Sequence, residues 1–163
     1  MNHFLLMTKK SWTWISITLG DDKGTIGEDL KNYVYSLTFQ PSREEPVKVP
    51  ADVRAFLDKH CSDIVSGDVE RIMANFSDQF LHRGQRKAFF EQYFRNDPSA
   101  PTKRGAILFE VTATVFEPQG DKAYIDGFSV GKTKGDADTT KGPISYQQII
   151  KENGQWKWYG NQK

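Results

Sequence analysis

The segment from Pro50 to Phe80 has a regular pattern of apolar and polar positions. Its apolar residues recur at spacings of three and four, which places them on one face of a helix: Val53, Phe56, Leu57, Cys61 and Ile64. Gly67 suits the position just past a helix end, and Asp68 suits the cap of a second, short helix. The pattern therefore predicts two helices that meet at a glycine, with one polar residue, His60, on the apolar stripe.

The remainder of the chain changes from helical to strand periodicity. Residues 86–96 carry aromatic side chains at helical spacing, which predicts a third helix, and the segment up to residue 105 has the composition of a loop. From Ala106 onward, alternating patterns predict four strands, over residues 106–118, 122–132, 143–152 and 155–162. Three helices followed by an antiparallel meander define an α+β fold whose helices cover one face of a bent sheet.

The first 48 residues have a different pattern. Residues 12–19 and 33–39 each have strand character and could pair as a hairpin, while residues 40–50 contain three prolines and are typical of a linker. We therefore expect an arm over residues 1–48 and a main domain over residues 49–163. The arm is expected to pack on the main domain or on a second subunit, and an independent fold is the alternative.

Composition narrows the possible partners. The 163 residues include 22 Lys and Arg against 21 Asp and Glu, so no overall charge attracts nucleic acid or an anionic membrane. The single cysteine and three widely spaced histidines predict no metal site, and no glycine-rich phosphate loop is present, so we expect no cofactor. Without an apolar run long enough to span a bilayer, the sequence favours a soluble protein, in the cytoplasm rather than exported.

Three stretches together resemble the nuclear transport factor two-like superfamily, which includes the SnoaL-like polyketide cyclases and ketosteroid isomerase: SGDVERIMANFSDQF, RKAFFEQYF and IIKENGQWKWYGNQ. The resemblance covers roughly residues 51–162. It implies a cone-shaped, cystatin-like α+β barrel with an apolar pocket between three helices and a curved sheet, usually in a homodimer formed through the outer sheet face. It implies no particular reaction, because this fold serves isomerases, dehydratases, cyclases and non-catalytic binders.

Ketosteroid isomerase needs a carboxylate base and two hydrogen-bond donors for an enolate oxygen. By the resemblance, the two donors match His60 and Tyr146, and the base would lie among His82, Arg83 and Gly84. None of these three is a carboxylate, which argues against steroid isomerisation.

A weaker set of catalytic candidates consists of His60, Asp126, Tyr146 and His82. A desolvated aspartate beside a histidine can form an acid–base pair suited to proton transfer. Each residue also has a structural interpretation: core hydrogen bonding for His60, backbone bonding or exposure at a sheet edge for Asp126, a solvated turn for His82 and core packing for Tyr146. The residues expected to contact a ligand are His60, Phe56, Phe90, Tyr93, Phe109, Tyr124, Asp126 and Tyr146.

The missing base and the abundant aromatic residues favour a non-catalytic module that binds a small apolar ligand or mediates dimerisation. The alternative is a small lyase, isomerase or cyclase that moves a proton with His60 and Asp126 while Tyr146 orients an oxygen. A third hypothesis is an interaction module that assembles through residues 11–40.

Overall fold

The computed structural model describes residues 2–7, 12–17 and 45–163. The chain divides into two compact units, Met1–Pro41 and Ser42–Lys163. In the first unit, strands β1 (Asn2–Met7) and β2 (Trp12–Ile17) pair antiparallel. The strand predicted from Trp12 is confirmed, and its partner β1 is a strand that the sequence pattern did not indicate.

The strand predicted over residues 33–39 lies outside the described residues, as does most of the proline-containing linker. The division after Pro41 precedes the boundary expected at residue 48. Residue 47, which was expected in the arm, belongs to the second unit, and its backbone amide donates a hydrogen bond to the Ala113 carbonyl at 2.9 Å.

The second unit begins with two helices, α2 (Ala51–Ser66) and α3 (Val69–Ala74). Gly67 ends α2 in the left-handed conformation with φ 71°, and the Asp68 carboxylate accepts a hydrogen bond from the Arg71 amide at 3.2 Å. Both caps predicted from the sequence are therefore confirmed.

A short hairpin of β3 (Leu81–His82) and β4 (Gln85–Arg86) leads into α4 (Lys87–Asn96), the third predicted helix. A fourth helix, α5 (Pro101–Arg104), corrects the expectation of a loop before residue 106. It fits the sequence locally, since Pro101 occupies its first turn and Gly105 follows its end with φ 67°.

One antiparallel sheet forms the remainder of the unit, and its strands are β5 (Ala106–Gln119), β6 (Lys122–Thr133), β7 (Thr140–Pro143), β8 (Gln148–Glu152) and β9 (Gln155–Trp158). The order is β5-β6-β8-β9, and β7 also pairs with β6. The single strand predicted over residues 143–152 is wrong, because β7 and β8 are separate strands on the same edge of β6.

Gly127 explains this division. It lies in β6 between the residues that pair with β7 and those that pair with β8, opposite a bulge between Ala113 and Val115. A Cβ at this position would lie 2.0 Å from the Thr112 carbonyl oxygen, so only glycine permits so close an approach of the two strands. The bulge and the glycine bend the sheet where the pairing on its edge changes.

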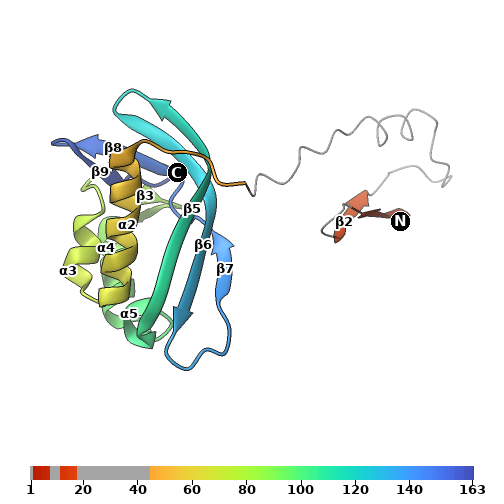
Figure 1. Ribbon diagram of the computed structural model, residues 1–163, viewed down its shortest axis with the longest axis horizontal. Helices are drawn as coiled ribbons and strands as arrows, with labels where there is room; N and C mark the ends of the chain where they lie inside the picture. Colours follow the sequence, from red (N-terminus) through yellow and green to blue (C-terminus); the bar gives the residue numbers. More distant parts are fainter. Residues whose placement is uncertain (1, 8–11, 18–44) are drawn as a thin grey trace. The chain divides into compact units, whose positions relative to one another are not determined.

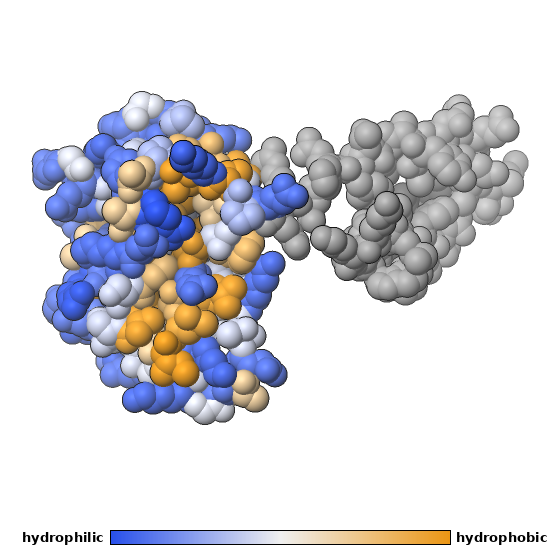
Figure 2. Space-filling model, in the orientation of Figure 1, coloured by the Kyte–Doolittle hydropathy of each residue, from blue (hydrophilic) through white to orange (hydrophobic). Residues whose placement is uncertain are grey.

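Helices α2 to α5 lie against one face of the curved sheet, as Figure 1 shows. Between them is a core of large side chains, among which Trp158, Phe76, Phe80, Leu57, Ile125 and Ile149 are almost fully buried. On the face of the molecule seen in Figure 2, a band of apolar residues runs between polar margins. The structure therefore has the α+β architecture predicted from the sequence.

Candidate functional site

A cavity of about 490 Å³ opens within the Ser42–Lys163 unit. Helices α2 and α4, the β3–β4 hairpin, and β5, β6 and β9 contribute to its walls. Most of the wall is apolar, and it includes the aromatic residues Phe89, Phe90, Tyr93, Phe94, Phe109 and Trp158. The volume is in the range typical of sites for small molecules.

His60 reaches the cavity from the buried stripe of α2 and is only 3% exposed. Its ring packs edge-to-face against Phe76, Phe109 and Trp158, with centroid distances of 6.1, 6.2 and 5.5 Å. Its Nδ1 atom has no hydrogen-bond partner among the described residues. Burial lowers the pKa of His60 to about 4, so the imidazole is neutral at pH 7.

Aromatic contacts continue from His60 across the cavity. Trp158 lies 5.5 Å from Tyr146 by ring centroids, and Tyr146 lies 5.7 Å from His82. The indole nitrogen of Trp158 is buried and has no hydrogen-bond partner among the described residues. Burial, with a smaller contribution from Tyr93, raises the pKa of Tyr146, so its hydroxyl is protonated and available as a donor at neutral pH.

His82 is 7% exposed and its Nδ1 atom, like that of His60, is buried without a hydrogen-bond partner among the described residues. Burial and the neighbouring Arg83 charge lower the pKa of His82, which keeps this imidazole neutral as well. Arg83 and Gln85, from the same hairpin, also line the cavity. The hairpin thus brings three polar side chains to one part of the wall.

The C-terminal segment fixes the position of this hairpin. The Arg83 amide donates to Asn161 Oδ1 at 3.0 Å, and the Gly84 amide donates to the Lys163 carbonyl at 2.6 Å. Gly160 permits the close approach, because a Cβ there would lie 2.2 Å from the Leu81 carbonyl oxygen and its φ is 81°. Residues 81–84 are therefore held against residues 159–163 before any ligand arrives.

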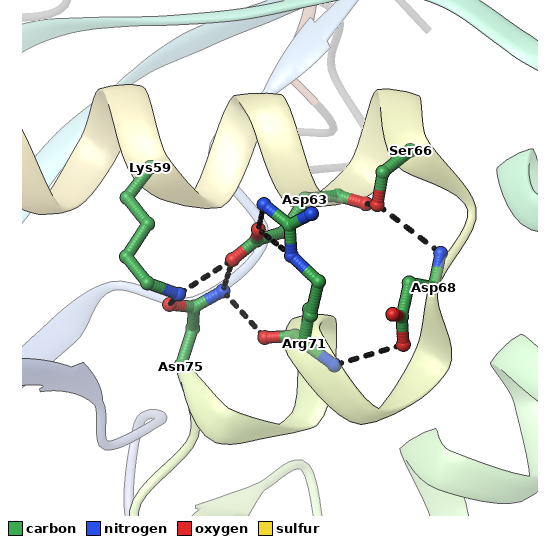
Figure 3. Close-up of polar contacts among 6 residues, drawn as sticks. All are labelled: Lys59, Asp63, Ser66, Asp68, Arg71 and Asn75. Atoms are coloured by element: carbon green, nitrogen blue, oxygen red, sulfur yellow. Dashed lines mark hydrogen bonds and ion pairs between the residues drawn. The ribbon is translucent and has the colours of Figure 1, made fainter.

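A polar cluster joins α2, the helix to which His60 belongs, to α3 (Figure 3). Asp63 is fully buried, and its carboxylate accepts hydrogen bonds from Lys59 at 2.6 Å, Asn75 at 2.8 Å and Arg71 at 3.0 Å. Burial alone would raise the pKa of Asp63, but these hydrogen bonds and the Lys59 and Arg71 charges leave it below its ordinary value. The carboxylate is therefore ionised and joins the two helices.

Six of the predicted site residues line the cavity, namely His60, His82, Phe90, Tyr93, Phe109 and Tyr146. Three others do not: Phe56, Tyr124 and Asp126. Phe56 is a core residue, 7% exposed, whose ring packs on Trp158 at 5.2 Å between centroids.

Asp126 and Tyr124 lie on the opposite face of β6 from the cavity. Their neighbour Ile125 is fully buried in the core, and successive side chains of a strand point to opposite faces. Asp126 instead accepts a hydrogen bond from the Gly127 amide at 2.8 Å. The structure therefore does not bring His60 and Asp126 together. The expectation that they form an acid–base pair is wrong.

Several cavity residues were not singled out from the sequence as ligand contacts, including Trp158, Phe89, Arg83 and Gln85. The alternation in QWKW does place Trp156 and Trp158 on one face of a strand, which was a usable signal. Arg83 and Gln85 belong to a polar turn, and no local pattern distinguishes a turn beside a cavity from a solvated one.

Within residues 2–7, 12–17 and 45–163, no group of three His, Cys, Asp or Glu side chains is placed to hold a metal ion. Among the helices of these described residues, none combines the length and the apolar character needed to cross a lipid bilayer.

Comparison with known proteins identifies the fold. No model of a protein family and no curated protein matches the chain significantly. Among solved structures, a nuclear transport factor two-like protein of unknown function from Shewanella oneidensis is similar with TM-score 0.52 and 16% identity, over 66% of this chain and 92% of that one. A protein of unknown function with a cystatin-like fold from Nostoc punctiforme is similar with TM-score 0.52 and 14% identity, over 69% of this chain and 90% of that one. The Ser42–Lys163 unit therefore has the cystatin-like fold of these structures.

Proposed function

We propose that the Ser42–Lys163 unit binds a small, largely apolar molecule in the 490 Å³ cavity without transforming it chemically. The observation that carries this proposal is a cavity with mostly aromatic walls that brings the polar side chains of His82, Arg83 and Gln85 to one part of its lining. Aromatic walls favour an apolar body, and the polar side chains favour a ligand that also offers polar atoms.

The composition of the wall supports binding rather than proton transfer. No aspartate or glutamate is found among the described residues that line the cavity. The two imidazoles are neutral, and neither has a carboxylate hydrogen-bonded to it among the described residues that would orient it as a general base. A lyase, isomerase or cyclase mechanism was expected to use Asp126, which lies on the other face of the sheet.

The experiment is a titration of the full chain with N-phenyl-1-naphthylamine, an uncharged fluorophore that brightens in apolar surroundings. Saturable binding is expected in the parent protein. Ser129→Phe places a ring into the cavity wall and is expected to weaken binding at least tenfold, whereas Ser62→Phe, on the exposed face of α2, leaves it unchanged.

Two results would contradict the proposal. One is the absence of saturable binding to a parent protein whose circular dichroism shows that it is folded. The other is equal binding by the Ser129→Phe and Ser62→Phe variants, which would place the fluorophore outside the cavity.

A further inference from the structure

The charges around the cavity are unevenly distributed. Arg83 is the one formally charged side chain among the described residues of the wall, since the two histidines are neutral at pH 7. No described aspartate or glutamate forms an ion pair with its guanidinium. A cation at the wall of an apolar cavity without a protein counter-charge favours an anionic group on the molecule that enters.

The neighbours of Arg83 suit the same group. His82 and Gln85 come from the same hairpin and also line the cavity. A neutral imidazole carries one N–H donor, and the Gln85 side-chain amide carries donors as well. One guanidinium and two neutral donors match the two oxygens and the single charge of a carboxylate.

The apolar part of the cavity wall indicates the chemistry of the rest of the ligand. The rings of Phe89, Phe90 and Tyr93 come from α4, which begins directly after the hairpin at Lys87. Phe89 is 51% exposed although it borders the cavity, so an apolar body lying there would cover an aromatic surface that water now contacts. The polar and apolar parts of the wall are thus adjacent in the chain.

We propose that the ligand is an apolar monocarboxylate whose charged end lies at His82, Arg83 and Gln85 and whose body lies against the aromatic residues of α4. This inference rests on the proposed function, because it specifies the class of molecule held by the same cavity. The hairpin is held by residues 159–163, so the carboxylate meets donors that are already in position.

The test compares two probes that differ in charge and little in shape, 2-naphthoate and 2-naphthamide. Each displaces N-phenyl-1-naphthylamine from the full chain at neutral pH, which reports the dissociation constant of each for the cavity. Naphthoate is expected to bind about fivefold more tightly than naphthamide, because solvent weakens a charge-assisted contact at an exposed arginine. Added salt is expected to weaken the binding of naphthoate and to leave the binding of naphthamide unchanged.

Arg83→Gln removes the charge and retains a donor, so it is expected to abolish the preference for naphthoate over naphthamide. Arg86→Gln is the matched control, because Arg86 is exposed and lies on the same hairpin, as Arg83 does, but it does not line the cavity. It is expected to retain the preference.

The outcomes separate the two proposals. If both naphthalene probes displace the fluorophore equally well and Arg83→Gln changes neither, the carboxylate inference is overturned and the binding function stands. If the fluorophore itself does not bind, both proposals are overturned. If naphthyl phosphate binds more than tenfold tighter than naphthoate, the site prefers a dianion and the assignment to a carboxylate is wrong.

Discussion

Replacing His60 by phenylalanine should remove a specific dependence of stability on pH. His60 is 3% exposed, and burial lowers its pKa to about 4. The unfolded chain therefore binds a proton on this residue at a pH where the folded chain does not. Because the pKa is lower in the folded state, the contribution of His60 is complete above about pH 6.5 and is lost as the pH falls toward 4.

The expected magnitude follows from this difference in pKa. With an unfolded value near 6.5, His60 alone should reduce the free energy of unfolding by about 2 kcal/mol at pH 5 and about 3 kcal/mol at pH 4, relative to pH 7. The Asp63 charge opposes the decrease in pKa and the Lys59 charge adds to it. His82 also has a lowered pKa and remains in the variant, so its contribution cancels in the comparison.

The assay is urea unfolding of the parent and of His60→Phe between pH 7 and pH 4, followed by circular dichroism of the helices. At pH 7 the free energies of unfolding of the two proteins should agree within about 1.5 kcal/mol. Phenylalanine can maintain the edge-to-face contacts, and the substitution removes a buried nitrogen without a partner. At pH 5 the free energy of unfolding of the variant, relative to that of the parent, should be about 2 kcal/mol higher than at pH 7. Parallel pH profiles for the two proteins would refute the view that His60 is buried as a neutral ring.

Three further predictions concern the framework and the assembly. Asp63→Ala should destabilise the protein by about 3 kcal/mol, since it leaves Lys59, Arg71 and Asn75 without their buried acceptor, whereas Asp58→Ala, which removes an exposed pair with Arg54, should cost less than about 1 kcal/mol in the same urea unfolding. Similar losses in the two variants would show that the Asp63 cluster does not stabilise the α2–α3 junction. Gly127→Ala should lower the free energy of unfolding by more than about 2 kcal/mol, because its Cβ would lie 2.0 Å from the Thr112 carbonyl oxygen. Gly142→Ala, with open space around it, should change the free energy of unfolding by no more than about 0.5 kcal/mol. If Gly127→Ala left the stability unchanged, the two strands could not approach so closely at the bend. The expected homodimer through the outer sheet face should be visible by sedimentation and should dissociate in Val130→Asp on that face of β6; a monomeric parent protein at micromolar concentration would exclude it.

The sequence predicted the elements of the fold well because most of their determinants are local. The apolar stripe of α2 identified His60 as a residue facing the interior, and the caps at Gly67 and Asp68 located the junction between two helices. The aromatic spacing in residues 86–96 likewise predicted α4 and two cavity residues on it, Phe90 and Tyr93. In each case the period of the pattern and the buried face coincide.

The choice of face on β6 could not be made in this way. Alternation separates the side chains of this strand into two sets, and both contain apolar residues, with Ala123 and Ile125 in one and Tyr124 and Phe128 in the other. The larger aromatic residues suggested the interior, but the core accommodates the smaller set, and Asp126 therefore lies outside. The error is one of phase, which only the packing of the sheet against the helices decides.

Arg83 was difficult to recognise for a different reason. Its place at the cavity depends on a hydrogen bond to Asn161, a residue 78 positions away in the sequence. The positive φ values of Arg83 and Gly84, 50° and 74°, belong to a tight turn that many polar sequences could form. Only the docking of the C-terminal segment turns this hairpin into part of a binding site.

The cavity is open to solvent, so water fills its 490 Å³ when no ligand is bound. Water there lies against aromatic walls that offer it few hydrogen bonds, so an apolar body that displaces it gains free energy while its charged end is held at Arg83.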